Sequence, residues 1–440
     1  MTEQIITPND PRVMGATDSH SIQNAIDFAM QNSHVVRIPR VNERTGTDVW
    51  TIEKTILLPS DITIILDSCH LRLADNVYEN IFRNENAYEE IGKTAEGAQH
   101  DIYIIGRGNA VLDGGKHNGV FEQTWRQLGL PHPRTGNLIL LVNVDGYALS
   151  NFKCINLRYW AINQLFCKHG KLENIHFYNG KKTHNQDGIN LRVGCSHITI
   201  QNITGRTGDD VVALSAFPAG TDNSEFNTDD RDIDIHDITI RDVHAHTRQT
   251  IVALRCSDGA KIYRVHIENI VDVGGWTPEY GPWGVVRLGE VNYYKERPVQ
   301  IGDMYEITVR GVHSQCRGTV FLGGGLKDSH ISDVYAGGSS MHAVSTFAQE
   351  TVFWENGCKR EGGVTMENVV IENIHFNGTA GFCDDPNFNV LGKEWYGAAL
   401  DFRCMREDDY LKNVIFRNIF ACENAEIAVC KMGVELDIRK

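Results

Sequence analysis

A short hydrophobic pattern recurs along most of this chain and limits the folds that it can adopt. Each copy reads apolar-x-apolar-x-x-apolar, and the copies include Ile198-Ile200-Ile203, Ile238-Ile240-Val243, Val265-Ile267-Ile270, Ile307-Val309-Val312, Val369-Ile371-Ile374 and Val414-Phe416-Ile419. A polar turn residue recurs just before the last apolar position, at Asn174, Asn202, Asp242, Asn269, Asn373 and Asn418. This repetition predicts stacked coils that bury their apolar positions against one another, with the asparagines forming a ladder.

The repeat favours an all-β fold, a right-handed single-stranded parallel β-helix. A sandwich or a propeller is the alternative. Propeller blades would repeat at roughly 40 to 50 residues with signatures of their own, and the sequence shows no such signature. We therefore expect one solenoid domain, with residues 1–45 as an N-terminal cap, residues 46–375 as the coils with the functional face, and residues 376–440 as the last coils and C-terminal loops.

One segment has the period of an α-helix instead. Residues 17–32 place five apolar side chains on one helical face, namely Ile22, Ala25, Ile26, Ala29 and Met30. Asp18 or Ser19 is expected to cap the first turn. Because the terminal units of a solenoid must be covered, we expect this helix to cap its open end.

The composition excludes several partners and cofactors. The chain has 440 residues, with 57 acidic against 42 basic side chains and a formal net charge of −15. It therefore lacks the basic stripe that a nucleic acid would require. Its eleven cysteines contain no C-x-x-C pair, so they indicate buried thiols and not a disulfide framework or a zinc site. We expect no metal and no other cofactor.

Targeting signals are also absent from the sequence as written. The first twenty residues carry neither a basic region nor an apolar one. No later stretch reaches the roughly 18 apolar residues that a membrane span requires. We therefore expect a cytoplasmic protein with no membrane partner, and the sequence leaves the oligomeric state open.

Two acidic motifs stand close together within the repeats. His184-Asn185-Gln186-Asp187-Gly188 is followed by Thr207-Gly208-Asp209-Asp210, so that Asp209 lies 22 residues after Asp187. That spacing is about one coil of a parallel β-helix, whose neighbouring strands lie roughly 4.8 Å apart. Asp187, Asp209 and Asp210 should therefore gather on one face, a costly arrangement unless they catalyse a reaction or bind a cation.

A second strand of each coil can be aligned through its leucine. Residues 187–192, 210–215, 250–255 and 284–289 then lie over one another. Alternation along a strand turns Asn190, Arg192, Ser215, Arg255 and Arg287 out of the core. One step upstream, the same outward face receives Gln186, Asp209, Gln249 and Trp283.

These residues resemble glycoside hydrolase family 28, the polygalacturonase family of pectin-lyase-like parallel β-helices. Asn185-Gln186-Asp187-Gly188 is similar to the family's Asn-Thr-Asp-Gly, and Gly208-Asp209-Asp210 to its Gly-Asp-Asp. The resemblance runs from about residue 10 to about residue 290 and includes residues 18–26, Val111-Leu112-Asp113-Gly114-Gly115, Trp125, Pro133-Arg134 and Leu157-Arg158-Tyr159-Trp160.

The resemblance implies inverting hydrolysis of a glycosidic bond. It makes Asp209 the general acid that protonates the leaving oxygen, while Asp187 and Asp210 activate water on the opposite face. Inverting enzymes hold their carboxyl groups roughly 6.5 to 9.5 Å apart to admit that water. Crowded carboxylates also favour keeping one of them protonated, as an acid catalyst requires.

Two departures from the family concern the substrate. Where the family has Gly-His-Gly, this chain has Arg248-Gln249-Thr250, with His244 and His246 slightly upstream. The family's Arg-Ile-Lys, whose cations hold a galacturonate carboxylate, appears as Arg287-Leu288-Gly289. Arg287 and Arg255 permit an anionic sugar but do not require one.

Further candidates each have a structural alternative. Trp276, Tyr280 and especially Trp283 could stack on sugar rings or could pack their loop. His184 could donate to the substrate or serve the local fold. Arg206 could pair with a carboxylate or lie on the surface. Residues 217–232 carry clustered acids that could bind calcium, although a solvated loop is the better interpretation.

The sequence thus predicts a glycoside hydrolase acting on an oligosaccharide, with His184, Gln249, Arg255, Trp283 and Arg287 binding the substrate. The alternatives are a carbohydrate lyase, an epimerase or an intramolecular glycosyl transferase on the same fold. A non-catalytic sugar-binding module is a further alternative, since fold alone does not imply function.

Overall fold

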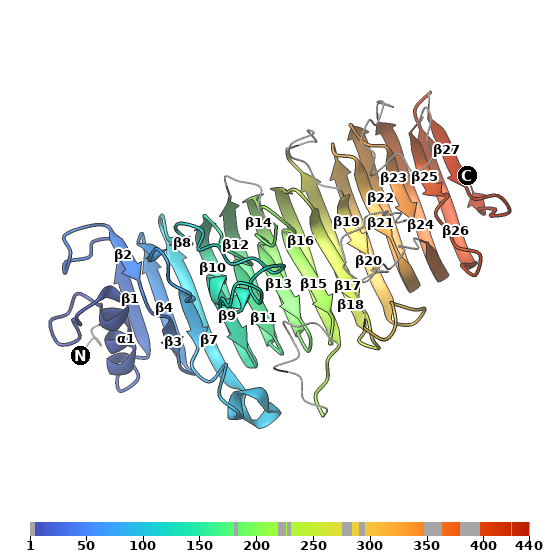
Figure 1. Ribbon diagram of the computed structural model, residues 1–440. Helices are drawn as coiled ribbons and strands as arrows, with labels where there is room; N and C mark the ends of the chain where they lie inside the picture. Colours follow the sequence, from blue (N-terminus) through green and yellow to red (C-terminus); the bar gives the residue numbers. More distant parts are fainter. Residues whose placement is uncertain are drawn as a thin grey trace. The chain divides into compact units, whose positions relative to one another are not determined.

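A computed structural model describes residues 5–179, 184–218, 226, 230–274, 284–289, 295–346, 363–378, 397–423 and 425–439. The chain is a right-handed parallel β-helix, as the repeats predict (Figure 1). It divides into two compact units. Unit 1 comprises Met1–Asp209 and Glu225–Asp232, and unit 2 comprises Asp210–Ser224 and Ile233–Lys440. The expectation that they form one domain stays a prediction.

In unit 1, longer and shorter strands form two parallel ladders. The long-strand ladder runs through β1 (Val35–Pro39), β4 (Ile62–Asp67), β7 (Gln99–Arg107), β10 (Val144–Ile155), β12 (Lys168–Tyr178) and β14 (Ser196–Arg206), with β2 (Val49–Ile52), β5 (His70–Leu73) and β8 (Val111–Asp113) beside it. The short-strand ladder runs through β3 (Ile56–Leu58), β6 (Phe82–Asn84), β9 (Ile139–Val142), β11 (Ile162–Leu165) and β13 (Ile189–Arg192). Among the described residues of unit 1, 3-10 turns lie at Ile91–Lys93, Ala95–Gly97 and Pro133–Gly136.

Unit 2 repeats the same two ladders. Its long strands are β16 (Ile235–His246), β18 (Ile262–Asp272), β20 (Met304–Ser314), β22 (Gly324–Gly338), β24 (Val364–Gly378), β26 (Leu411–Ala421) and β28 (Ile438–Arg439). Its short strands are β15 (Val212–Ala216), β17 (Thr250–Cys256), β19 (Gly284–Leu288), β21 (Gly318–Leu322), β23 (His342–Thr346), β25 (Ala398–Phe402) and β27 (Glu426–Cys430).

The hydrophobic repeat forms the core of each unit. In unit 1, Ile175 pairs with Ile203 across β12 and β14, and in unit 2 Ile270 pairs with Val312 across β18 and β20. All four side chains are fully buried. Each buried aliphatic side chain stabilises the fold by about 1.5 to 3 kcal/mol. The leucine alignment of the short strands is also confirmed in unit 2, where Leu254 pairs with Leu288.

The predicted asparagine ladder is present within both units. Asn174 and Asn202 adopt left-handed backbone angles, with φ of 55° and 53°, and Asn174 Nδ2 donates to Asn151 Oδ1 at 2.8 Å. In unit 2, Asn418 Nδ2 donates to Asn373 Oδ1 at 2.9 Å. Asparagine tolerates this left-handed conformation better than most residues. The recurring polar residue therefore turns each long strand and joins neighbouring coils.

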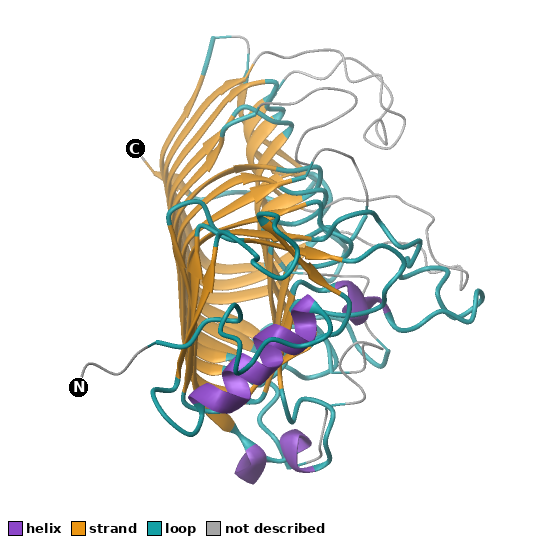
Figure 2. Ribbon diagram, turned by 90° about the vertical axis from the view of Figure 1, so that its left-hand side faces the viewer, coloured by secondary structure: helices purple, strands orange, loops and turns teal. Residues whose placement is uncertain are grey.

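Helix α1 (Asp18–Ala29) covers β1, β2 and β3 of unit 1, as expected of a cap (Figure 2). The predicted N-cap is wrong, because Thr17 caps the helix by accepting from the His20 N–H at 3.3 Å. Asp18 instead accepts from Asn42 Nδ2 at 2.8 Å and from the Thr51 N–H at 2.8 Å. The Asp18 carboxylate therefore connects the helix to the first coils through hydrogen bonds.

Candidate active site

The two acidic motifs meet directly within unit 1. The Asn185 N–H donates to Asp209 Oδ2 at 2.7 Å. The N–H groups of Gly208 and Asp209 lie 3.0 and 3.3 Å from the carbonyl oxygen of Gln186, to which they donate. The spacing of 22 residues therefore places the motifs side by side, as the coil length predicts. Asp209 is only half-buried.

Asp187 lies just ahead of β13 and is 3% exposed. Its Oδ2 accepts from Asn190 Nδ2 at 3.1 Å, and its carbonyl oxygen accepts from the Ala161 N–H at 2.9 Å. A side chain and a neighbouring coil thus both position this residue. Asn190, which the alternation turns out of the core, orients the carboxylate.

Gln186 replaces the threonine of the family's motif and has a structural role in unit 1. Asn179 Nδ2 donates to Gln186 Oε1, and Gln186 Nε2 donates to the carbonyl oxygen of Leu157. The buried amide therefore holds the motif onto the preceding coil. This contact explains why a long amide is accommodated between Asn185 and Asp187.

Glu122 is a site residue that the sequence did not indicate. Its Oε2 accepts from Asn185 Nδ2 at 2.8 Å, so a further carboxylate adjoins the residue that contacts Asp209. Glu122 lies 63 residues before Asn185 in the connection between β8 and β9. No spacing rule links a long connection to a distant coil, and the sequence contained no signal for this contact.

The third aspartate is held firmly within unit 2. Asp210 Oδ1 accepts from the Thr250 N–H at 3.0 Å, and Oδ2 accepts from Arg255 Nη2 at 2.9 Å. The side chain of Asp210 is 5% exposed and that of Arg255 is 16% exposed. The guanidinium of Arg255 therefore pairs with a carboxylate that is almost fully buried. Arg255, predicted to bind substrate, therefore also serves as the partner of Asp210.

Gln249 and Arg287 lie on the same side of unit 2. Gln249 directly precedes Thr250, and its carbonyl oxygen accepts from the Gly284 N–H at 3.4 Å. Arg287 pairs in register with Ala253, and its Nε donates to the carbonyl oxygen of Gly289 at 3.3 Å. Gln249 therefore belongs to the coil that contacts Asp210, and Arg287 belongs to the next coil.

The glycine that replaces the family's lysine is required by the backbone. Gly289 has a φ of +100°, and a Cβ atom there would lie 1.7 Å from the carbonyl oxygen of Gly323. No side chain fits in that space. A lysine is therefore excluded at this position by the close approach of the backbone between the coils that contain β19 and β21.

The histidines and aromatic candidates have different positions. His184 is exposed in the turn ahead of Asn185, and Trp283 lies outside the described residues, as do Trp276 and Tyr280. His246 Nδ1 lies 2.9 Å from Asp272 Oδ1. A Cβ at Gly274 would lie 2.3 Å from the His246 ring, so this glycine makes room for the imidazole. His244 pairs in register with Val271.

Two arginines singled out in the sequence, Arg192 and Arg206, can be placed in unit 1. Arg192 lies over the ring of Trp160, with the guanidinium carbon 4.6 Å from the ring centroid, and is 5% exposed. Arg206 Nε donates to the carbonyl oxygen of Asn179 at 2.9 Å. Most of the acids in the suggested calcium loop, Asp222, Glu225 and Asp229, lie outside the described residues.

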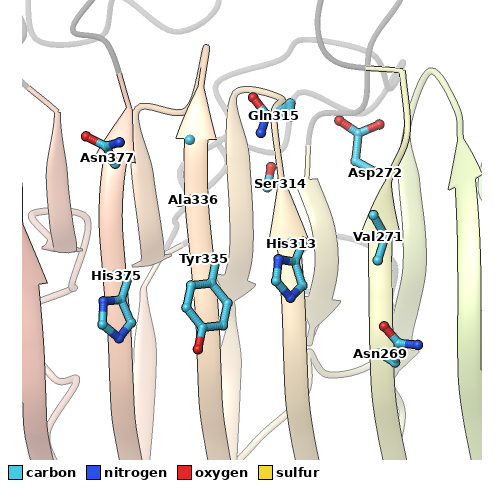
Figure 3. Close-up of a pocket in the computed structure, with 11 residues that line it drawn as sticks. Asn269, Val271, Asp272, His313, Ser314, Gln315, Tyr335, Ala336, His375 and Asn377 are labelled. Carbon is cyan, nitrogen blue, oxygen red and sulfur yellow. The ribbon is translucent and has the colours of Figure 1, made fainter.

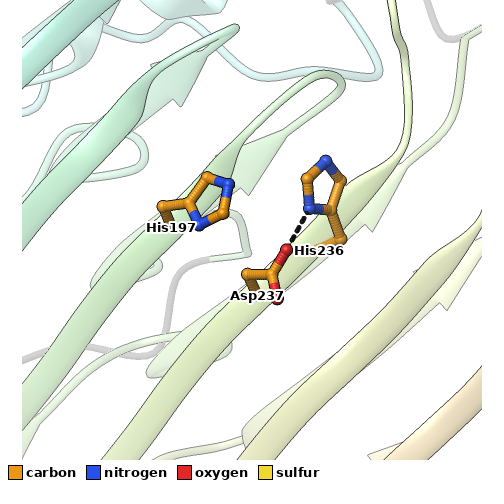
Figure 4. A group of neighbouring side chains, drawn as sticks. All are labelled: His197, His236 and Asp237. Atoms are coloured by element: carbon orange, nitrogen blue, oxygen red, sulfur yellow. Dashed lines mark hydrogen bonds and ion pairs between the residues drawn. The ribbon is translucent and has the colours of Figure 1, made fainter.

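Asp237 in unit 2 forms a surface ion pair with His236 and Arg264. His236 Nδ1 contacts Asp237 Oδ2 at 2.6 Å (Figure 4). Arg264 binds the same carboxylate through two nitrogens, at 2.7 and 2.6 Å. Hydrogen bonding from Arg264, with a smaller contribution from His236, holds the pKa of Asp237 well below its usual range. Both carboxylate oxygens of Asp237 thus have partners.

Comparisons with known proteins agree with this description. Residues 85–228 match the family described as Glycosyl hydrolases family 28. That segment contains both acidic motifs and Glu122, so the resemblance seen in the sequence is confirmed, at a divergent level. No curated protein sequence matches the chain significantly. The family match supports a carbohydrate-active β-helix.

Solved structures share the fold at low sequence identity. A polygalacturonase from Erwinia carotovora ssp. carotovora is 14% identical, with a TM-score of 0.55 over 100% of this chain and 98% of that one. A surface adhesin of Streptococcus pneumoniae is 13% identical, with a TM-score of 0.58 over 95% and 92%. The mannuronan C-5 epimerase A-module of Azotobacter vinelandii is 12% identical, with a TM-score of 0.55 over 96% and 97%. None of the described helices is long and apolar enough to cross a membrane.

Proposed function

We propose that this chain, which resembles family 28 over residues 85–228, hydrolyses a glycosidic bond of an oligosaccharide. The observation that carries the proposal is the hydrogen bond from the Asn185 N–H to Asp209 Oδ2 at 2.7 Å. It joins the two acidic motifs at the residue that resembles the family's general acid. An adhesin has the same fold, so the proposal rests on these residues and not on the fold.

In the proposed reaction, Asp209 gives its proton to the leaving glycosidic oxygen as the bond to the anomeric carbon breaks. Asp187 and Asp210 activate a water molecule, and one of the two takes its proton as the water attacks the same carbon from the opposite face, which inverts its configuration. The hydrogen bonds from Arg255 Nη2 and from the Thr250 N–H hold the Asp210 carboxylate in a fixed position for this task. The Asn190 amide orients Asp187 for the same role.

The proposed substrate is a neutral oligosaccharide or one with few carboxylates. Gly289 leaves no room for the lysine that holds galacturonate in the family, and Arg287 is the cation that remains near this position. We propose His184, Gln249, Arg287 and Trp283 as substrate-binding residues. A cytoplasmic location, as the sequence predicts, would limit the substrates to short fragments taken up by the cell.

The test is incubation of the purified protein with neutral and uronic oligosaccharides, following new reducing ends and unsaturated uronates in parallel. We expect new reducing ends without unsaturated products, inversion at the anomeric carbon by NMR, and at least a hundredfold loss of kcat in Asp209→Asn, in line with general-acid catalysis. Asp237→Asn is the matched control, because it removes a carboxylate from the surface pair, and it should keep full activity. Unsaturated products would instead assign a lyase. An inactive wild-type protein across the panel would contradict hydrolysis.

A further inference from the structure

A column of stacked rings lies on the long strands of unit 2, outside the predicted catalytic residues. His313, Tyr335, His375 and Phe420 follow one another across β20, β22, β24 and β26. Their ring centroids are separated by 4.7, 5.0 and 4.8 Å, and neighbouring planes differ by 15°, 10° and 20°. All four side chains are exposed. Because the rings cover each other's faces, their edges point to solvent.

Beside this column the surface is hollowed into a pocket of about 470 Å³ (Figure 3). Two glycines and a small side chain explain the hollow. Gly311 takes the corner position that Asn269 occupies in the preceding coil, and Gly337 pairs with Asn377 at the outer end of β22 and β24. Val271 replaces an aromatic ring in the column next to His313. The volume falls within the range of small-molecule sites, about 300 to 1,000 Å³.

The pocket is lined by neutral hydrogen-bonding groups. The amide side chains of Gln315 and Asn377 stand on either side of Ala336 (Figure 3). Gly337 pairs in register with Asn377. The imidazole nitrogens of His313 and His375 and the Tyr335 hydroxyl lie on the exposed rings beside these amides. Amides, imidazoles and phenols both donate and accept hydrogen bonds. This combination matches a ligand that is rich in hydroxyl groups.

Charge in the pocket wall selects against anions. Asp272 lines the pocket and its side chain has no exposed area. Its Oδ1 accepts from His246 and from the Gly274 N–H, whereas Oδ2 is buried without a hydrogen-bond partner. No lysine or arginine is among the lining residues. A buried carboxylate that is satisfied on one oxygen favours a nearby donor and repels a carboxylate.

We propose that this pocket is a second carbohydrate-binding site, which takes a neutral sugar unit through hydrogen bonds from its hydroxyl groups to Gln315, Asn377 and the ring column. None of the three aspartates is among the residues that line the pocket, and binding there does not depend on hydrolysis. The pocket would hold a neutral glycan against unit 2. Uronic sugars are disfavoured, because the wall contains the carboxyl group of Asp272 and the lining residues include no lysine or arginine.

Saturation-transfer NMR on the Asp209→Asn protein tests this site without turnover. The probes are cellotriose, xylotriose, mannotriose and galactotriose, with trigalacturonate as the charged comparison. We expect at least one neutral trisaccharide to give a signal that falls at least fivefold in the additional variant Gly337→Trp, which fills the pocket. The substitution is compatible with the fold, because a Cβ at Gly337 has its nearest neighbour at 3.5 Å.

The matched control is Lys412→Trp, which adds the same side chain at an exposed position of β26 outside the pocket. It should leave the signal unchanged. An undiminished signal in Gly337→Trp would place binding elsewhere and overturn the proposal. The absence of a signal with every neutral probe would also overturn the proposal. A Gly337→Trp variant that lost only the trigalacturonate signal would overturn it as well. Because no reducing ends are measured, none of these outcomes bears on the hydrolysis of the proposed function.

Discussion

At the scale of single residues, the buried carboxylate of Asp210 is stabilised by its hydrogen-bond partners. Asp210 is almost fully buried, and its two oxygens accept from the Arg255 guanidinium and the Thr250 N–H. A buried carboxylate of this kind is stable only while its partners remain. Asp210 and its partners therefore affect the free energy of unfolding as well as the proposed reaction.

Removal of the Arg255 guanidinium should show how far the stability of the protein depends on this ion pair. We expect Arg255→Ala to lower the free energy of unfolding by about 3 kcal/mol, since it leaves a buried charge unpaired. Urea unfolding followed by circular dichroism measures the loss. The double variant Asp210→Asn/Arg255→Ala should lose clearly less than the sum of the two single variants. Simple additivity would mean that the two groups do not interact.

Gly289 offers a test of why the family's lysine is missing. We expect Gly289→Ala to cost at least about 3 kcal/mol, because backbone strain adds to a clash with the carbonyl oxygen of Gly323. Gly259→Ala is the control, since Gly259 also has a positive φ, of +92°, but its Cβ would have only the end of Arg297 nearby, at 3.7 Å. It should cost about 1 kcal/mol. Equal melting temperatures for the two variants would rule out the clash.

Asp113, in the Asp-Gly-Gly segment of the family resemblance, makes stability depend on pH. Burial would raise its pKa, but hydrogen bonds from His70, Asn156 and the Gly115 N–H outweigh burial and lower it. The native pKa therefore lies below the unfolded one, so its contribution is present above the unfolded value and is lost as the pH falls. We expect Asp113→Asn to cost about 2 kcal/mol at pH 7 and much less near pH 3. A cost independent of pH in urea titrations would contradict this assignment.

At the scale of elements, each coil is joined to the next by side chains as well as by strand pairing. Asn174 sits between Asn151 and Asn202, donating to the first at 2.8 Å and accepting from the second at 2.5 Å. Its backbone has a φ of 55°. The residue therefore supplies both a left-handed turn and two hydrogen bonds.

Two substitutions separate these contributions. We expect Asn174→Ala to lower the free energy of unfolding by about 2 to 3 kcal/mol, because it loses the ladder and strains the backbone. Asn174→Gly keeps the backbone conformation at little cost and should lose about 1 to 2 kcal/mol. Chemical denaturation of the two proteins decides between them. A larger loss in the glycine variant would show that the turn conformation is not what asparagine provides.

At the scale of the whole molecule, the dominant property is charge. The formal net charge is −15, and a surface field of one sign changes the rate at which charged ligands arrive. A polyanionic substrate would approach against this field. A neutral oligosaccharide would not respond to it.

Ionic strength should therefore discriminate between substrates. For any uronic oligosaccharide that is cleaved, we expect kcat/KM to rise severalfold when the salt concentration increases from about 0.02 to 0.3 M, because salt screens the repulsion. For a neutral substrate of the same length, kcat/KM should change less than twofold. Initial rates at several salt concentrations measure both. A fall in kcat/KM for the uronic substrate would instead indicate a local cationic site.

The sequence by itself determined the β-helix, the register of its coils, the asparagine ladder and the meeting of the two acidic motifs. These features follow from a local period that each coil repeats, so neighbouring coils need no further information to align. Only the tertiary structure decided that Thr17 caps the helix, that Glu122 contacts Asn185, that Arg255 holds Asp210 and that Gly289 admits no side chain. The Glu122 and Arg255 contacts join segments through connections of irregular length, and the Thr17 cap and the Gly289 position depend on local backbone geometry. None of these is set by the repeat.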